Sequence, residues 1–100
     1  MNSTHPVTAC SQPRLHCYYS GRVQGVGFRY TVKNLAIQYN VSGYVRNLPD
    51  GRVELVMEGP DTELEQLAQA VADRMAGYIR AVDKLTLPAT GEFSHFTIRH

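Results

Sequence analysis

The stretch from Ser20 to Arg29 combines a glycine-spaced loop with an arginine that follows directly after it. The glycines let the backbone turn with its N–H groups pointing inward, and they let a ligand approach the chain closely. An apolar stripe with helical spacing follows, and the unpaired N–H groups of a helix N-terminus favour an anion. Arg29 would lie in the first helical turn, where its guanidinium can donate to two phosphate oxygens. This pattern indicates a phosphate or carboxylate site; the alternative is a structural turn followed by a surface arginine.

Asn47 is the second candidate, because it lies at the end of an expected strand, just before a turn over residues 49–51. A side-chain amide both donates and accepts hydrogen bonds, which suits it to hold a water molecule. The alternative is that Asn47 only shapes the turn. Arg46 and Arg52 lie on either side of the same turn, where they would add positive potential or, as we expect, remain solvated charges.

The remaining titratable side chains form no recognisable catalytic group. His16, His95 and His100 lie at strand positions or at the chain end without an obvious serine, cysteine or aspartate partner, so we expect surface or packing roles. Glu54 and Glu58 fall on one strand face and could mimic a carboxylate pair. A solvated or ion-paired face is the favoured interpretation of these two glutamates.

Cys10 and Cys17 are the only cysteines, and neither belongs to a C-x-x-C pattern or to a Cys–His pair with metal spacing. Cys17 falls within an alternating apolar stretch, so we expect a small buried hydrophobic side chain there. The glycines fit neither the G-x-G-x-x-G dinucleotide pattern nor a P-loop, which requires Gly-Lys followed by Ser or Thr. The sequence therefore predicts no metal, no cofactor, and neither a dinucleotide nor a nucleoside triphosphate ligand.

Length and charge limit the possible functions further. The chain has 100 residues, which is enough for one domain with one modest core. The net charge of +1 argues against nucleic-acid binding by bulk electrostatics, so any anion site must be built from a few aimed donors. No apolar run approaches the roughly 18 residues of a membrane span, and residues 1–14 lack the features of a secretory signal. We expect a cytoplasmic monomer with neither a membrane nor a nucleic-acid partner.

The elements that must position these residues follow from hydrophobic periodicity. Strands are predicted over residues 15–21, 44–48, 52–58, 78–87 and 93–99. Helical stripes begin at Phe28 and near Asp61, the second with a Thr62–Glu65 capping box. Two helices on one face of a mostly antiparallel sheet give a ferredoxin-like βαββαβ sandwich of the α+β class, with an additional short C-terminal strand. Residues 1–14 are expected to form a flexible arm, and residues 15–100 the domain.

Two long motifs stand at a separation that is characteristic of one family. They are Gly-Arg-Val-Gln-Gly-Val-Gly-Phe-Arg over residues 21–29 and Gly-Tyr-Val-Arg-Asn-Leu-Pro-Asp-Gly-Arg-Val-Glu over residues 43–54. The Glu58-Gly59-Pro60 sequence that ends a strand and the Phe96-x-Ile98 pattern near the C-terminus match as well. Together these patterns resemble the acylphosphatase family, and the resemblance runs from Leu15 to the C-terminus.

The resemblance implies a small metal-free enzyme that hydrolyses acyl phosphates to a carboxylate and inorganic phosphate. Carried over by position, Arg29 would bind the phosphate, Asn47 would position the attacking water, and the loop backbone would surround the phosphoryl oxygens. That backbone belongs to Gln24, Gly25, Val26, Gly27, Phe28 and Arg29. Two positions depart from the common pattern, with Tyr44 in place of a frequent tryptophan and Gly27 in place of a bulkier residue or cysteine. We expect both to change packing or loop flexibility and to leave the named groups in place.

Hydrolysis of an acyl phosphate needs few catalytic groups, because its leaving group is a carboxylate. The conjugate acid has a pKa of about 4 to 5, so the group departs without a proton donor. Positioning and charge stabilisation then remain as the task of the protein. The expected partners are an acyl phosphate substrate and inorganic phosphate or another anion at the loop. No pattern in the sequence defines a pocket for the acyl group.

Three other functions share features with this sequence. A non-catalytic phosphate- or anion-sensing ferredoxin-like module would keep the loop, but the intact Arg29 and Asn47 disfavour it. A ferredoxin-like RNA-binding module displays aromatic side chains on its central strands, whereas residues 53–58 have none and Tyr18 is a weak substitute. A carbamoyl-phosphate-handling domain of a larger maturation protein is disfavoured for a chain of this length.

Overall fold

The structure is a computed structural model, and it describes residues 12–100 of the chain. Within this range, strands and helices follow one another in the predicted order. They are β1 (Pro13–Gly21), α2 (Phe28–Ala36), β2 (Ser42–Asn47), β3 (Val53–Glu58), α3 (Asp61–Arg74), β4 (Ile79–Pro88) and β5 (Phe96–Arg99). No helix in the described range is long and apolar enough to cross a membrane.

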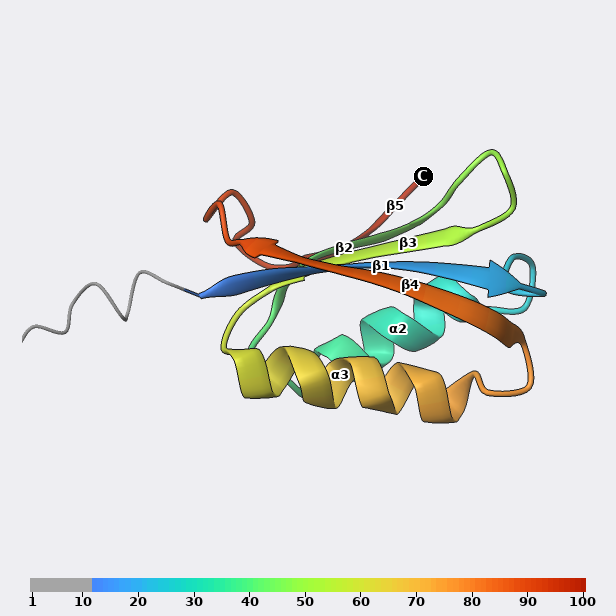
Figure 1. Cartoon of the computed structure of the whole chain (residues 1–100), viewed down its shortest axis with the longest axis horizontal. Coiled ribbons are helices and arrows are strands. Elements are labelled where there is room, and N and C mark those ends of the chain that lie inside the picture. Colours follow the sequence, from blue (N-terminus) through green and yellow to red (C-terminus); the bar gives the residue numbers. More distant parts are fainter. Residues whose placement is uncertain (1–11) are drawn as a thin grey trace, which may run out of the picture.

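The strands form one sheet in the order β4-β1-β3-β2-β5, and both helices pack on the same face of it (Figure 1). Neighbouring strands are antiparallel except β2 and β5, which run parallel. β5 is shorter than predicted, since residues 93–95 continue the loop that precedes it. The arrangement is a ferredoxin-like α+β sandwich with an additional strand at one edge, so the predicted fold class is confirmed.

The hydrophobic core lies between the sheet and the two helices, and it follows the alternation seen in the sequence. On β1, Cys17 and Tyr19 are buried in the core, while His16 and Tyr18 stack on one another on the other face of the sheet. Burial raises the pKa of the free Cys17 thiol, as expected of a small side chain used for packing. The helices bury the predicted stripes, formed by Phe28, Val32, Leu35 and Ala36 on α2 and by Leu64, Leu67, Ala68 and Val71 on α3.

β1 begins two residues earlier than the sequence suggests. Its first residues are paired with the end of β4, Pro13 with Pro88 and Arg14 with Leu87. The last two residues of the predicted arm over residues 1–14 therefore belong to the sheet. The rest of that arm, residues 1–11, lies outside the described part of the chain, and so does Cys10.

The predicted capping box at the start of α3 is wrong. The helix begins at Asp61, and its N-cap residue is Pro60, which makes no side-chain cap hydrogen bond. Thr62 already lies inside the first helical turn, so its hydroxyl cannot act as the cap for Glu65. The carboxylates of Asp61 and Glu63 in the first turn interact favourably with the positive end of the helix dipole instead.

Candidate active site

The glycine loop connects the end of β1 to the start of α2. Gly25 and Gly27 have φ angles of 79° and 78°, in the left-handed region that side chains disfavour. Gly27 is the N-cap residue of α2, and its carbonyl oxygen accepts a hydrogen bond from the Thr31 N–H at 3.0 Å. The cap supplies no side-chain acceptor, and the first turn of α2 contains no acidic residue. Neither a cap side chain nor an acidic side chain of the first turn thus offers an acceptor to the first N–H groups of the helix, an arrangement that suits the anion site predicted from the loop pattern.

Gln24 ties this loop to the β2–β3 hairpin through its side chain, a contact that the sequence did not reveal. Its Nε2 donates to the carbonyl oxygens of Leu48 at 2.8 Å and Arg52 at 2.9 Å. Since Asn47 directly precedes Leu48, the contact holds the loop beside the end of β2. The sequence signal was only a polar side chain in a glycine loop, because both acceptors lie more than twenty residues away.

Arg29 and Asn47 line the same small cavity, which has a volume of about 120 Å³. The structure thus brings together the two side chains that the sequence singled out. Four of the six predicted backbone positions also line this cavity, and Gln24 and Val26 do not. The full lining consists of Val23, Gly25, Gly27, Phe28, Arg29, Tyr30 and Asn47.

Asn47 ends β2, opposite Val53 on β3. Its Oδ1 atom is buried and has no hydrogen-bond partner among residues 12–100. Buried polar atoms are nearly always paired, because an unpaired one costs about 1–3 kcal/mol. This oxygen therefore marks a position suited to a polar group that the described chain does not supply.

The Arg29 guanidinium is contacted from the C-terminal end of the chain. Its Nη1 donates to the Arg99 carbonyl oxygen at 3.3 Å and contacts the His100 Nδ1 at 3.2 Å. Both contacts use the same nitrogen, and an arginine side chain carries five N–H donors in all. The sequence could not predict this contact, because it depends on the parallel pairing of β5 with β2.

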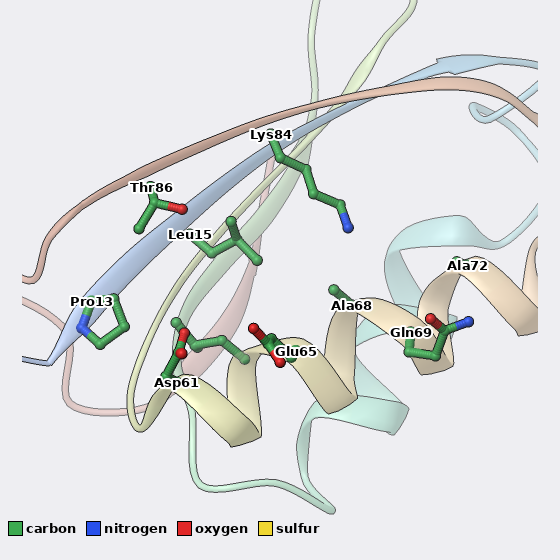
Figure 2. Close-up of a pocket in the computed structure, with 10 residues that line it drawn as sticks. Pro13, Leu15, Asp61, Glu65, Ala68, Gln69, Ala72, Lys84 and Thr86 are labelled. Atoms are coloured by element: carbon green, nitrogen blue, oxygen red, sulfur yellow. The ribbon is translucent and has the colours of Figure 1, made fainter.

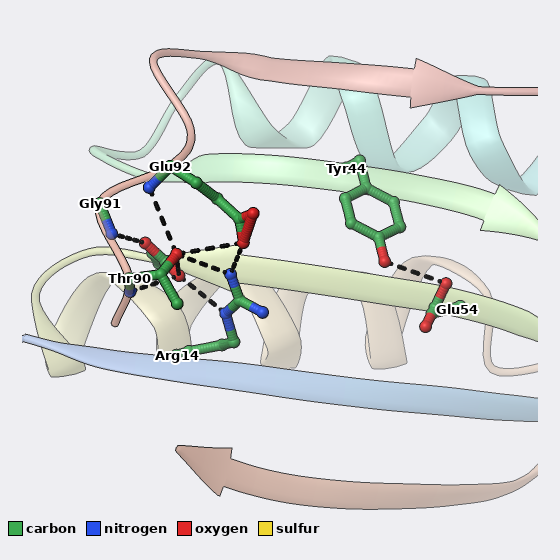
Figure 3. A network of polar contacts seen from close by, with 7 residues as sticks. Arg14, Tyr44, Glu54, Thr90, Gly91 and Glu92 are labelled. Carbon is green, nitrogen blue, oxygen red and sulfur yellow. Dashed lines mark hydrogen bonds and ion pairs between the residues drawn. The ribbon is translucent and has the colours of Figure 1, made fainter. Parts of the chain in front are cut away.

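Glu54 of β3 lies on the face of the sheet opposite the helices (Figure 3), and Glu54 and Glu58 are only 4% and 5% exposed. Glu54 accepts hydrogen bonds from Arg46 Nε at 2.6 Å and the Tyr44 hydroxyl at 3.2 Å, and it pairs with His16 Nε2 at 2.7 Å. Burial raises the pKa of the Glu54 carboxyl, but the bonds from His16 and Arg46 outweigh it and lower the pKa overall. The expectation of an ion-paired face is confirmed, although the pairs are buried and His16 has a partner after all.

Glu58 anchors the loop between β4 and β5 (Figure 3). One of its oxygens accepts hydrogen bonds from Arg14 Nε at 2.7 Å and from the N–H and hydroxyl of Thr90 at 2.9 and 3.0 Å. The other accepts one from the Gly91 N–H at 3.0 Å. Burial raises the pKa of this carboxyl, but the donors outweigh it and lower the pKa overall. Both oxygens are thus occupied by groups of the protein itself.

A larger groove of about 410 Å³ lies between α3 and the strands β1 and β4 (Figure 2). Asp61 and Glu65 on α3 and Lys84 on β4 line it with charges of both signs. It shares no lining residue with the cavity of Arg29 and Asn47, and neither long motif contributes to it. The smaller cavity is therefore the candidate site, because Arg29 and Asn47 line it. Within residues 12–100, no group of three His, Cys, Asp or Glu side chains is placed to hold a metal ion.

Comparison with known protein families covers both motifs and most of the chain. The sequence model of the acylphosphatases matches residues 15–98. The chain belongs to the acylphosphatase family. The resemblance that residues 21–29 and 43–54 suggested is thereby confirmed.

Individual acylphosphatases are similar to the chain over most of their length. The acylphosphatase of Acidothermus cellulolyticus is 42% identical over 95 residues, which cover 91% of this chain and 90% of the relative. That of Roseiflexus sp. is 42% identical over 86 residues, covering 85% and 92%. The crystal structure of acylphosphatase from Bacillus subtilis matches with a TM-score of 0.80 at 30% identity, covering 88% of this chain and 99% of that one. The chain is therefore an enzyme with acylphosphatase activity, as predicted.

Proposed function

We propose that this acylphosphatase cleaves the carboxyl–phosphate bond by in-line attack of a water molecule held by Asn47. Arg29 and the backbone of residues 24–29 bind the phosphate. One observation carries the proposal: Arg29 and Asn47, whose buried Oδ1 has no partner among residues 12–100, line one cavity at the N-terminus of a helix. Among residues 12–100, the lining of that cavity contains no carboxylate, histidine or cysteine, so the proposed reaction relies on placement and charge.

The phosphate binds where backbone donors and positive charge converge. The first N–H groups of α2 and the positive end of its dipole attract an anion. Arg29 is the second residue of α2, and its guanidinium can donate to two phosphate oxygens at once. A cation at this end of a helix opposes the dipole, and a bound phosphate offsets that unfavourable placement.

Asn47 orients the water because its side-chain oxygen accepts a hydrogen bond from it. A lone pair of the water oxygen then faces phosphorus and forms the new P–O bond. The bond between phosphorus and the acyl oxygen breaks, and its electron pair stays on the departing carboxylate. The phosphate product keeps one O–H from the water, and the second proton moves to another phosphate oxygen.

The departing carboxylate explains why so few groups suffice. Its conjugate acid has a pKa of about 4 to 5, so it leaves as an anion at neutral pH without a proton donor. The developing charge on the phosphoryl oxygens is stabilised by Arg29 and the loop N–H groups, which are already in position. This division of tasks matches the lining of the cavity.

The same proposal covers the binding of inorganic phosphate and the bounds of the catalytic domain. Inorganic phosphate, as the product, binds at the same loop and competes with the substrate. Residues 15–100 form the catalytic domain together with Pro13 and Arg14, which belong to β1, and the arm before them stays a prediction from the sequence. The monomeric state stays a prediction from the sequence. The cytoplasmic location stays a prediction from the sequence.

Substitution of Arg29 and of Asn47, one at a time, tests whether the first binds the phosphate and the second positions the water. Steady-state hydrolysis of benzoyl phosphate gives kcat and KM, and inhibition by inorganic phosphate reports the anion site separately. Asn47→Ala is expected to lower kcat about 100- to 1000-fold, since a misplaced or missing catalytic contact has this effect. Its phosphate inhibition constant should stay within about two-fold of the parent value. Arg29→Ala is expected to lose both hydrolysis and phosphate inhibition.

Arg52→Ala is the matched control, because it removes a charge beside the same hairpin without touching the cavity. Its backbone carbonyl, which binds Gln24, remains in place. An Asn47→Ala enzyme as fast as the parent would contradict the role of Asn47. A parent chain that binds phosphate but turns over no acyl phosphate would be an anion-sensing module instead.

A further inference from the structure

The acyl group of the substrate needs a surface beyond the groups that bind the phosphate. The cavity is small, with a volume of about 120 Å³, and its polar side chains belong to Arg29 and Asn47. In an in-line reaction the acyl group departs on the side of phosphorus opposite the attacking water. We therefore expect the acyl group to extend from the phosphate toward the rim of the cavity.

One residue of the lining offers this acyl group an exposed apolar surface. Two of the seven lining residues are glycines without side chains, and two are buried in the hydrophobic core. Two more are the polar Arg29 and Asn47. The seventh is Tyr30, which is 61% exposed.

The position of Tyr30 on α2 directs its ring toward the loop. Phe28 and Val32 face the core, and Tyr30 lies between them in sequence, on the solvent side of the helix. Side chains of an α-helix lean toward its N-terminus, which here is the end that forms the cavity. Tyr30, a lining residue of the cavity, thus carries its ring on the exposed side of α2, leaning toward the end of the helix that forms the cavity.

We propose that Tyr30 binds the acyl group and makes this acylphosphatase selective for acyl phosphates with a flat or extended apolar acyl group, such as aroyl phosphates. The inference rests on the phosphate site proposed above. An aryl ring can stack on the tyrosine ring, and such pairs contribute about two- to twelve-fold in binding. The single methyl group of acetyl phosphate covers little of the ring and gains little from it.

The test compares benzoyl phosphate with acetyl phosphate as substrates of the parent and of Tyr30→Ala. We expect kcat/KM for benzoyl phosphate to fall about five- to ten-fold, mainly through KM, because the ring binds substrate and transition state alike. The fall for acetyl phosphate should be less than two-fold, so the ratio of the two specificity constants changes. Tyr30→Phe keeps the ring and should preserve the ratio of the parent.

Ile37→Ala is the control for the loss of an exposed apolar side chain, taken from the opposite end of the same helix. Ile37 is 76% exposed, but it caps the C-terminal end of α2, away from the cavity. It should leave both substrates within two-fold of the parent. Thermal unfolding of each variant separates a loss of binding from a loss of folded protein.

The outcomes distinguish this inference from the proposal on which it rests. A parent that hydrolyses neither substrate overturns the proposed function and the inference with it. A parent that hydrolyses both, with Tyr30→Ala lowering both equally or neither, overturns the role of Tyr30 alone. A Tyr30→Phe variant as impaired as Tyr30→Ala would also overturn it, because the hydroxyl and not the ring would then matter.

Discussion

Buried polar groups occur in two regions of this molecule, and they differ in how they are paired. On the open face of the sheet, Glu54 and Glu58 each accept at least three hydrogen bonds or ion pairs from the protein. At the glycine loop, the Asn47 oxygen is buried with no partner among residues 12–100. A buried polar group without a partner lowers stability, so a fold retains one only where another interaction compensates. The paired region therefore holds the fold, whereas the unpaired oxygen supports the role toward a ligand that we propose for Asn47.

The comparison also shows that a shifted pKa alone does not locate a catalytic group. Glu54 and Glu58 have lowered pKa values and are among the more conspicuous titratable groups of the chain. Structural ion-pair networks produce such shifts as readily as active sites do. Because every oxygen of these carboxylates already accepts a bond from the protein, the shift reflects anchoring of a loop and of neighbouring strands.

Removal of Glu58 should destabilise the fold far more than removal of Asn47, although both side chains bury polar atoms. Glu58→Ala leaves the Nε of Arg14 and two backbone N–H groups of the loop after β4 without their acceptor. We expect it to lower the free energy of unfolding by about 3 kcal/mol. Asn47→Ala removes a buried oxygen that has no partner to lose and whose burial is itself unfavourable, so the free energy of unfolding should stay the same or rise, by up to about 1–3 kcal/mol. Urea unfolding of the parent and both variants measures the difference.

Glu92→Ala is the matched control for this experiment. Glu92 also pairs with Arg14, but its side chain is 53% exposed. The loss should therefore remain below about 1 kcal/mol. If Asn47→Ala destabilised the protein as much as Glu58→Ala, the Asn47 oxygen would be a structural group and the two regions would not differ in role.

Gly25→Ala tests whether the loop backbone contributes to the site as proposed. With φ at 79°, an alanine there is strained by about 1 kcal/mol, but an added Cβ meets no atom within 4 Å. Relaxation of this strain turns the loop N–H groups away from the phosphate. We expect kcat/KM for benzoyl phosphate to fall about tenfold, since a displacement of about 1 Å can cost up to about 100-fold.

Gly77→Ala provides the control for this substitution. An added Cβ there also meets no atom within 4 Å, and the φ of Gly77 lies outside the left-handed region. Its activity should stay within two-fold of the parent. If Gly25→Ala were equally active, the loop backbone would not bind the phosphate, and Arg29 would remain as its main ligand.

The sequence predicted the order and type of the strands and helices, because burial of one face imposes a period of 2 or 3.6 residues. The sequence did not predict the ends of strands and helices that depend on contacts with distant segments. Pro13 joins β1 only because the end of β4 lies beside it, at Pro88. The N-cap of α3 at Pro60 likewise differs from the local pattern around Thr62, since hydrogen bonds and not residue types set the helix start.

At the candidate site, too, the sequence predicted local features and missed contacts between distant residues. Arg29 and Asn47 could be predicted because each lies in a local motif, and the two motifs resemble those of a known family. The bonds from Gln24 to the hairpin and from Arg29 to the end of β5 could not, because their partners lie 24 to 71 residues away. Tyr30 carries no sequence signal of its own, and its role follows only from its exposure at the rim of the cavity.

The smallest effect should be the pH dependence of stability, which the paired region sets and the candidate site does not. Burial raises the pKa values of Glu54 and Glu58, but their hydrogen bonds lower them overall. Such carboxylates stabilise the fold above their unfolded pKa of about 4.3, and this contribution is lost as the pH falls from there through the folded value. The thermal midpoint should fall over this range, and less steeply in Glu58→Gln. Asn47→Ala removes no ionisable group and should keep the parent slope, so a flatter one would mean that a titrating group depends on the candidate site.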